Sequence, residues 1–178
     1  MFQTIQPKDP KIRALPYPFL GALAMSNDVE FFNFHFFDPF MEFLNTKRTT
    51  CFGMGLGLEV TSSFFFYSTH PDSISYFAGI DPKAQLSPLA NRIVDYLRSG
   101  WIDTNHSYGD FDGVGGFQRE HALRCYEVLA KLGLTIRVFT NHGSGENIQN
   151  VGSDAKYHCG DLRGHEAYHA DLMKQNGI

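Results

Sequence analysis

The chain has 178 residues, enough for one domain with a buried core. Its 15 basic and 19 acidic side chains give a net charge of −4, and the basic residues do not cluster, which argues against nucleic acid as a partner. The sequence contains no apolar run near the roughly 20 residues of a membrane span and no secretory signal, so we expect a cytoplasmic protein that does not bind membranes.

The N-terminal part of the chain is predicted to lead into a first buried strand. Four prolines among residues 1–18 predict an extended lead-in, and residues 19–178 are predicted to form one α/β domain. The apolar run over residues 19–26 indicates a buried strand. Two carboxylates follow it, Asp28 and Glu30.

Helical and strand patterns alternate in the next part of the chain. A proline in the first turn predicts a helix over residues 39–45, with Asp38 as its N-cap. Residues 58–67 are rich in β-branched and aromatic side chains, which predicts a second strand. Residues 88–97 carry apolar side chains at helical spacing, and Gly100 is predicted to end that helix.

The alternation continues to the C-terminus. The patterns predict a third strand over 101–106, a helix over 117–132, a fourth strand over 134–140, a weak strand end near 157–161 and a helix over 165–175. Strands that alternate with helices favour a parallel sheet or barrel with right-handed crossovers. The carboxyl ends of its strands then meet at one edge.

Polar side chains follow several of these strands directly. In α/β proteins, ligands bind at the carboxyl edge of the sheet, so a functional site is expected where these side chains converge. The side chains concerned are Asp28 and Glu30 after the first strand, Asn105, His106, Ser107, Tyr108 and Asp110 at the third, and Asn141 and His142 at the fourth.

Three short runs share features with a known enzyme family. Residues 26–30 are SNDVE, residues 57–65 are GLEVTSSFF, and residues 106–110 are HSYGD. In this order the chain, over roughly residues 19–145, resembles the polysaccharide deacetylases of the NodB-homology type. That family has an acidic motif at its first strand and two histidines four residues apart after a later strand; here Asp110 replaces the second histidine.

The resemblance implies a partial or distorted (β/α) barrel that uses one divalent metal, zinc, to remove an acyl group such as acetyl from a carbohydrate. It implies that the metal ligands are Asp28, His106 and Asp110, with Glu30 as general base and His142 as general acid. The substrate is expected to contact Asn105, Ser107, Tyr108 and Asn141.

A closed barrel of this kind takes about 200 to 250 residues. The chain stops soon after the helix predicted over 165–175, where a further strand would follow. We therefore expect that the barrel lacks its C-terminal units, or that another copy of the chain completes it.

Two other functions compete with the deacetylase hypothesis. His165, Glu166 and His169 form a His-Glu-x-x-His motif, in which two histidines on one helix face bind zinc and the glutamate is the general base of a metalloprotease. The other alternative is a barrel remnant without catalysis that binds sugar or a partner through its aromatic surface.

Overall fold

The centre of the fold is the strand β4 (Thr61–Ser68), which contains four consecutive aromatic side chains. Seven of its eight residues are buried, so both of its faces are covered, as in the interior of a parallel sheet. The computed structural model describes residues 15, 17–18, 23–29, 33–111, 116–143, 147–152 and 157–178. The predicted lead-in therefore lies almost wholly outside the described residues.

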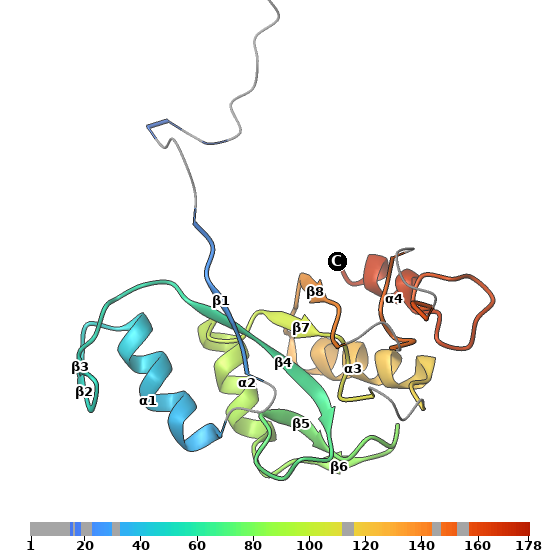
Figure 1. The fold of residues 1–178 in the computed structure, drawn as a ribbon, viewed down its shortest axis with the longest axis horizontal. Helices are drawn as coiled ribbons and strands as arrows, with labels where there is room; N and C mark the ends of the chain where they lie inside the picture. The colour runs from blue at the N-terminus through green and yellow to red at the C-terminus, as the bar shows by residue number, and fades with distance from the viewer. Residues whose placement is uncertain are drawn as a thin grey trace, which may run out of the picture.

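Six strands form one mixed sheet, which is parallel except for its last pair (Figure 1). Its order is β6 (Gln85–Leu86), β5 (Ser75–Ala78), β4, β7 (Thr104–His106) and β8 (Val138–Thr140), and β1 (Ser26–Asp28) also pairs with β4. The mostly parallel sheet agrees with the predicted alternation. The described strands form an open sheet that ends at β6 and β8, without closing into a barrel.

The strands are shorter than the sequence predicts. The strand predicted over 101–106 begins at Thr104, and the strand predicted over 134–140 begins at Val138. Residues 157–161 form turns and irregular structure instead of the predicted strand end. Apolar side chains at these places contact the core without pairing their backbones in the sheet.

Helix α1 (Phe34–Asn45) begins earlier than predicted. Asn33 is its N-cap and accepts a hydrogen bond from a backbone N–H, so Pro39 lies inside the helix. The predicted cap, Asp38, has a different role: its carboxylate accepts a hydrogen bond of 2.7 Å from the hydroxyl of Tyr96. Asp38 therefore bonds to a side chain of another helix instead of capping α1.

Two further helices match the predicted ones closely. Helix α2 (Ala90–Ser99) ends at Gly100, and α3 (Arg119–Leu132) ends at Gly133. Both glycines are left-handed, with φ of 77° and 65°, the conformation in which glycine commonly ends helices. None of the described helices is both long and apolar enough to cross a bilayer.

Helices cover the two faces of β4. The hydroxyl of Ser62 lies 3.7 Å from the sulfur of Met41 in α1, and the ring of Tyr67 contacts the ring of His121 in α3 at 4.9 Å between centroids. Residues 62 and 67 point to opposite faces because side chains alternate along a strand. The sheet is therefore buried between α1 and α3, and its carboxyl edge is left to loops.

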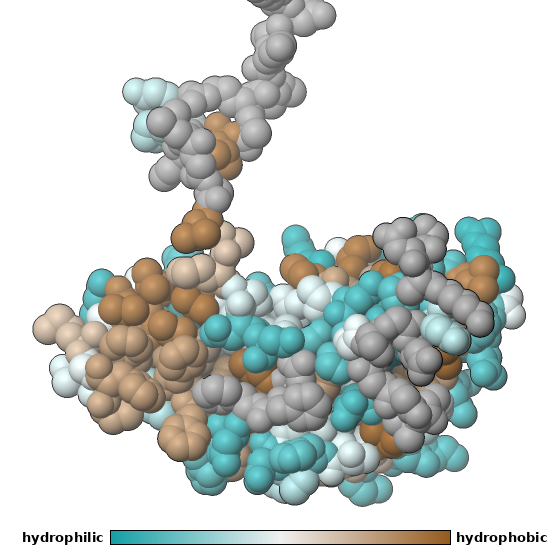
Figure 2. Space-filling view, viewed as in Figure 1, coloured by the Kyte–Doolittle hydropathy of each residue, from teal (hydrophilic) through white to brown (hydrophobic). Residues whose placement is uncertain are grey.

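Apolar side chains also gather on the surface over α1 and the hairpin of β2 (Thr49–Thr50) and β3 (Gly53–Met54), which Figure 2 shows in brown. The ring of Phe52, half exposed, lies 6.3 Å from that of Phe40 and 5.8 Å from that of Phe43. The hairpin thus extends the aromatic packing of α1 to the surface.

Candidate functional site

The carboxyl ends of β1 and β7 bring together two of the predicted ligands. Asp28 lies opposite Ser63 in the pairing of β1 with β4, and β7 pairs with β4 on its other side. His106 Nδ1 donates a hydrogen bond of 2.7 Å to Asp28 Oδ1, and Ser63 Oγ donates one of 2.8 Å to the same oxygen. The imidazole is 9% exposed and the carboxylate 54%, so solvent reaches the pair from the side of Asp28.

The loop after β8 adds a second histidine. His142 Nδ1 lies 3.3 Å from His106 Nε2, and the backbone oxygen of Asn141 lies 3.1 Å from that same Nε2. Both imidazoles pack on the ring of Phe65, with centroid distances of 5.5 Å to His106 and 4.7 Å to His142. Asp28, His106 and His142 therefore form a row across the sheet, which we call the Asp-His-His row.

The contacts of His106 determine its chemistry. An ionised carboxylate only accepts hydrogen bonds, so Asp28 keeps a proton on Nδ1. Nε2 is the nitrogen left for a metal, but it lies 3.1 Å from the backbone oxygen of Asn141, which also only accepts, so metal binding at Nε2 must replace that contact. Two nitrogens bound to one tetrahedral zinc at about 2.0–2.1 Å lie about 3.3 Å apart. The 3.3 Å between His106 Nε2 and His142 Nδ1 fits that spacing.

This geometry favours roles for Asp28 and His142 that differ from the predicted ones. Asp28 holds the far nitrogen of His106, the usual position of a carboxylate that orients a metal-binding histidine, and His142 stands where a ligand would stand. Within the described residues, no group of three or more His, Cys, Asp or Glu side chains is arranged to hold a metal ion. The predicted base, Glu30, lies outside the described residues.

Asp110 is not brought to the row. Gly109 is level with Tyr67 on β4, whereas Asp28 is level with Ser63, four residues and about 13 Å earlier along the strand. An aspartate side chain is too short to span that separation. The predicted ligand set of Asp28, His106 and Asp110 is therefore not assembled, because the register of β7 on β4 carries Asp110 past the site.

A buried amide that sequence reasoning missed holds His142 in place. Asn150 Oδ1 accepts hydrogen bonds of 3.0 Å from Ser107 Oγ and from the backbone N–H of His142, and its Nδ2 donates one of 2.8 Å to the backbone oxygen of His142. Asn150 is 1% exposed. The signal in the sequence is a cluster of amide side chains in one loop, Asn147, Gln149 and Asn150. Amide side chains both donate and accept hydrogen bonds, so they can satisfy the backbone groups of a buried loop.

The backbone directly after His106 also helps to fix the loop that carries His142. Ser107 has a left-handed φ of 51°, and its N–H donates a hydrogen bond of 2.7 Å to the backbone oxygen of Thr140. Gln149 joins the same two segments: its Oε1 accepts a hydrogen bond from the N–H of Tyr108, and its Nε2 donates one to the backbone oxygen of Gly109, both at 2.8 Å. The loop that carries His142 is thus fixed to the strand end that carries His106.

Three of the four predicted substrate contacts are buried, and the side-chain oxygen of one, Asn105, has no hydrogen-bond partner among the described residues. Ser107 and Tyr108 are fully buried, and Asn105 is 2% exposed. Tyr108 stacks on Phe117, and its hydroxyl lies 3.0 Å from that of Tyr126, whose pKa is raised to about 12 mainly by burial.

Asn141 is the one of the four predicted contacts that is exposed. Its Nδ2 donates a hydrogen bond to the backbone oxygen of Val151, and its Oδ1 accepts one from the N–H of Val151. Burial thus leaves Asn141 as the one of these four residues that is open to solvent, and the substrate contacts of all four remain a prediction.

The His-Glu-x-x-His motif is not presented on a helix. Helix α4 (Ala170–Gln175) begins only after His169, which is its N-cap, whereas the sequence predicts a helix from residue 165. His169 is fully buried; its Nδ1 donates to the backbone oxygen of Ala167 at 3.0 Å. His165 and His169 therefore do not share the helix face that a zincin requires.

The burial of His169 makes the stability of the protein sensitive to acid. Burial lowers the pKa of His169 from 6.5 to about 4. As the pH falls from 6.5 towards 4, His169 binds a proton in the unfolded chain but stays neutral in the folded chain, so the free energy of unfolding decreases. The free energy of unfolding, measured in urea, is expected to fall between pH 7 and pH 4.5 in both proteins. The fall is expected to be about 2–3 kcal/mol smaller in His169→Gln than in the wild type.

His35→Gln is the control for this experiment, because His35 is an exposed histidine of α1. It is expected to show the same pH dependence as the wild type. An equal loss of stability on acidification in His169→Gln and the wild type would contradict the prediction.

Comparisons with known proteins do not extend these observations. No family model, no curated protein and no solved structure matches the chain significantly. The residues of the Asp-His-His row and their contacts therefore carry the functional argument.

Proposed function

We propose that this protein is a metal-dependent hydrolase that removes an acyl group, such as acetyl, from a carbohydrate, by cleaving an amide bond other than a peptide bond. The supporting observation is the Asp-His-His row at the carboxyl edge of the sheet, with His106 Nε2 and His142 Nδ1 at the spacing of two nitrogens on one zinc. The carbohydrate substrate follows from the resemblance of residues 26–30 and 106–110 to the polysaccharide deacetylases.

Zinc or a similar divalent ion, when bound, supplies a polarised acyl oxygen and a water of lowered pKa. His106 and His142 would hold it through Nε2 and Nδ1. Asp28 accepts the Nδ1 proton of His106, which fixes the ring and makes Nε2 more basic, and the hydroxyl of Ser63 in turn orients Asp28. Phe65 lies against both imidazoles and excludes water from that side of the row.

Glu30 remains the proposed general base, because it follows Asp28 by two residues in the sequence. Its task is to accept the proton of the attacking water and then to deliver that proton to the leaving amine, so that one residue acts first as base and then as acid. His142 is reassigned from the predicted acid to a metal-binding role, since its Nδ1 faces His106.

The proposal is tested by acetate release from N-acetylated and O-acetylated saccharides. The purified full chain is stripped of metal with a chelator, reloaded with zinc and analysed by elemental mass spectrometry. We expect one equivalent of zinc, and acetate release only in the reloaded sample.

His165→Ala serves as the control, because its side chain belongs to the alternative motif and not to the row. It is expected to keep both zinc and activity. Failure of the wild type to bind zinc, acetate release that does not depend on zinc, or loss of zinc in His165→Ala would overturn the proposal.

A further inference from the structure

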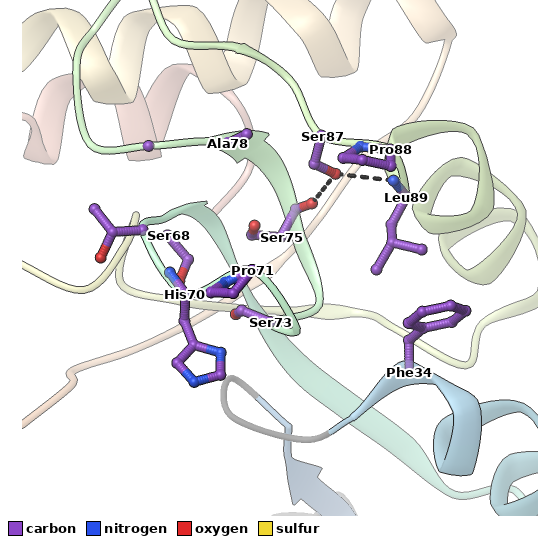
Figure 3. A pocket seen from close by; sticks show the side chains of 12 residues that line it. Phe34, Ser68, His70, Pro71, Ser73, Ser75, Ala78, Ser87, Pro88 and Leu89 are labelled. Carbon is purple, nitrogen blue, oxygen red and sulfur yellow. Dashed lines mark hydrogen bonds between the residues drawn. The ribbon is translucent and has the colours of Figure 1, made fainter.

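A cavity separate from the Asp-His-His row lies at the carboxyl ends of β4 and β5, beside the starts of α1 and α2 (Figure 3). Its volume is about 630 Å³, within the range of about 300–1,000 Å³ that is usual for small-molecule sites. Ser68, at the end of β4, lines it three residues after Phe65, so the cavity and the row adjoin the same strand. This edge of an α/β sheet is where ligands bind.

One side of the cavity is apolar. The side chain of Leu89 points towards the ring of Phe34, and both lie across the cavity from His70 (Figure 3). Pro71 and Pro88 add further apolar surface. An aromatic ring beside aliphatic groups offers a flat surface for the C–H face of a ligand ring.

Two serine hydroxyls on the polar side of the cavity already donate their protons within the protein. Ser75 Oγ donates its proton to the backbone oxygen of Phe77 at 3.1 Å, and Ser87 Oγ donates its proton to the backbone oxygen of Ser75 at 2.5 Å. Ser87 Oγ also accepts a hydrogen bond of 3.1 Å from the backbone N–H of Leu89, so it keeps one lone pair for a ligand, and Ser75 Oγ likewise offers only lone pairs. A ligand that fits them must donate hydrogen bonds.

The lining also sets the charge of the ligand. Among the twelve lining residues that the structure describes, none is Asp, Glu, Lys or Arg, and His70 is the one histidine. A charged ligand would lose its hydration here without gaining a partner of opposite charge. The lining therefore favours an uncharged ligand.

We propose that this cavity binds a neutral sugar unit. A pyranose ring combines the three required properties: it is uncharged, it has an apolar C–H face that stacks on Phe34, and its hydroxyls donate to Ser75 and Ser87. The inference does not rest on the proposed hydrolysis, because binding is measured without turnover.

The test is a titration of the nitrogen-15-labelled full chain, followed by NMR. The probes are the methyl glycosides of glucose, galactose, mannose and N-acetylglucosamine, with glucuronate, glucosamine and cyclohexanol as the anionic, cationic and apolar comparisons. At least one neutral glycoside is expected to shift the amides of residues 68–79 and 87–89 in a saturable way, and the three comparison compounds to bind at least about ten-fold more weakly.

Two variants and a matched control locate the site. Phe34→Ala is expected to weaken binding about ten-fold by removing the stacking surface, and Ala78→Leu is expected to abolish it by filling the cavity. Phe36→Ala, on the same helix but 62% exposed and outside the cavity, is expected to bind as the wild type does.

Several results would overturn the inference. It fails if no neutral glycoside shifts those amides in the folded wild type, or if the shifts are confined to other residues. It also fails if cyclohexanol or a charged sugar binds as tightly as the neutral glycosides, or if Ala78→Leu binds them as the wild type does. Loss of acetate release alone would leave the inference standing, which separates it from the proposed function.

Discussion

Replacing His106 with alanine is expected to abolish zinc binding and to lower acetate release by about 1,000-fold or more, because metal assistance supplies several kcal/mol of transition-state stabilisation. His106 is the central member of the row: its Nδ1 contacts Asp28 and its Nε2 faces His142. The measurement is kcat/KM for acetate release, together with bound zinc by elemental mass spectrometry.

Asp28→Asn gives this experiment a graded comparison. The asparagine oxygen can still accept the proton of His106 Nδ1, but the negative charge that raises the basicity of the ring is lost. A loss of about 10–100-fold in zinc affinity or activity is expected, less than for His106→Ala. His35→Ala, at an exposed position on α1, should leave both quantities unchanged. A larger defect in Asp28→Asn than in His106→Ala would mean that Asp28 is itself a ligand.

Replacing Gly109 with alanine is expected to destabilise the fold by about 3 kcal/mol, at the upper end of the range for overpacked sites. A Cβ at this position would lie 2.5 Å from the backbone oxygen of Tyr67 and 2.8 Å from its Cβ. That oxygen accepts the N–H of Asp110, so the backbone of β4 cannot move away without breaking the contact. Urea unfolding at pH 7 measures the effect.

Gly100→Ala is the matched control for Gly109→Ala. A Cβ at Gly100 meets no atom within 4 Å, and the residue has a φ of 77°. Its replacement should cost about 1–2 kcal/mol, the strain of a left-handed alanine. If Gly109→Ala were the less damaging of the two changes, the close approach of residues 109 and 67 would be refuted.

Local patterns were sufficient to predict the helices α2 and α3 and the mostly parallel sheet. Gly100 ends α2 as predicted, and Gly133 ends α3 in the same way, because glycine adopts the left-handed conformation at little cost. Asp28 and His106 lie at strand ends as predicted, and they meet because β1 and β7 both pair with β4 in parallel, one on each side of it. The buried strand predicted over residues 19–26 is instead the short β1, which begins at Ser26 and is largely exposed.

The register of the strands and the packing of the helices required the tertiary structure. Asp110 is four residues from His106 in sequence, yet the pairing of Gly109 with Tyr67 takes it away from the row. Strand register depends on contacts between distant segments, which a single run of residues does not specify.

Burial likewise assigned roles that side-chain type alone left open. His169 has the sequence context of a zinc ligand, but Tyr108, Phe117 and Phe139 surround it, so it is a core residue. Asn150 lacks any such motif, yet it holds His142 beside His106. The sequence alone thus determined the helices α2 and α3 and the strand ends that carry Asp28 and His106. Tertiary packing decided which of those groups meet, because their contacts join segments far apart in the chain.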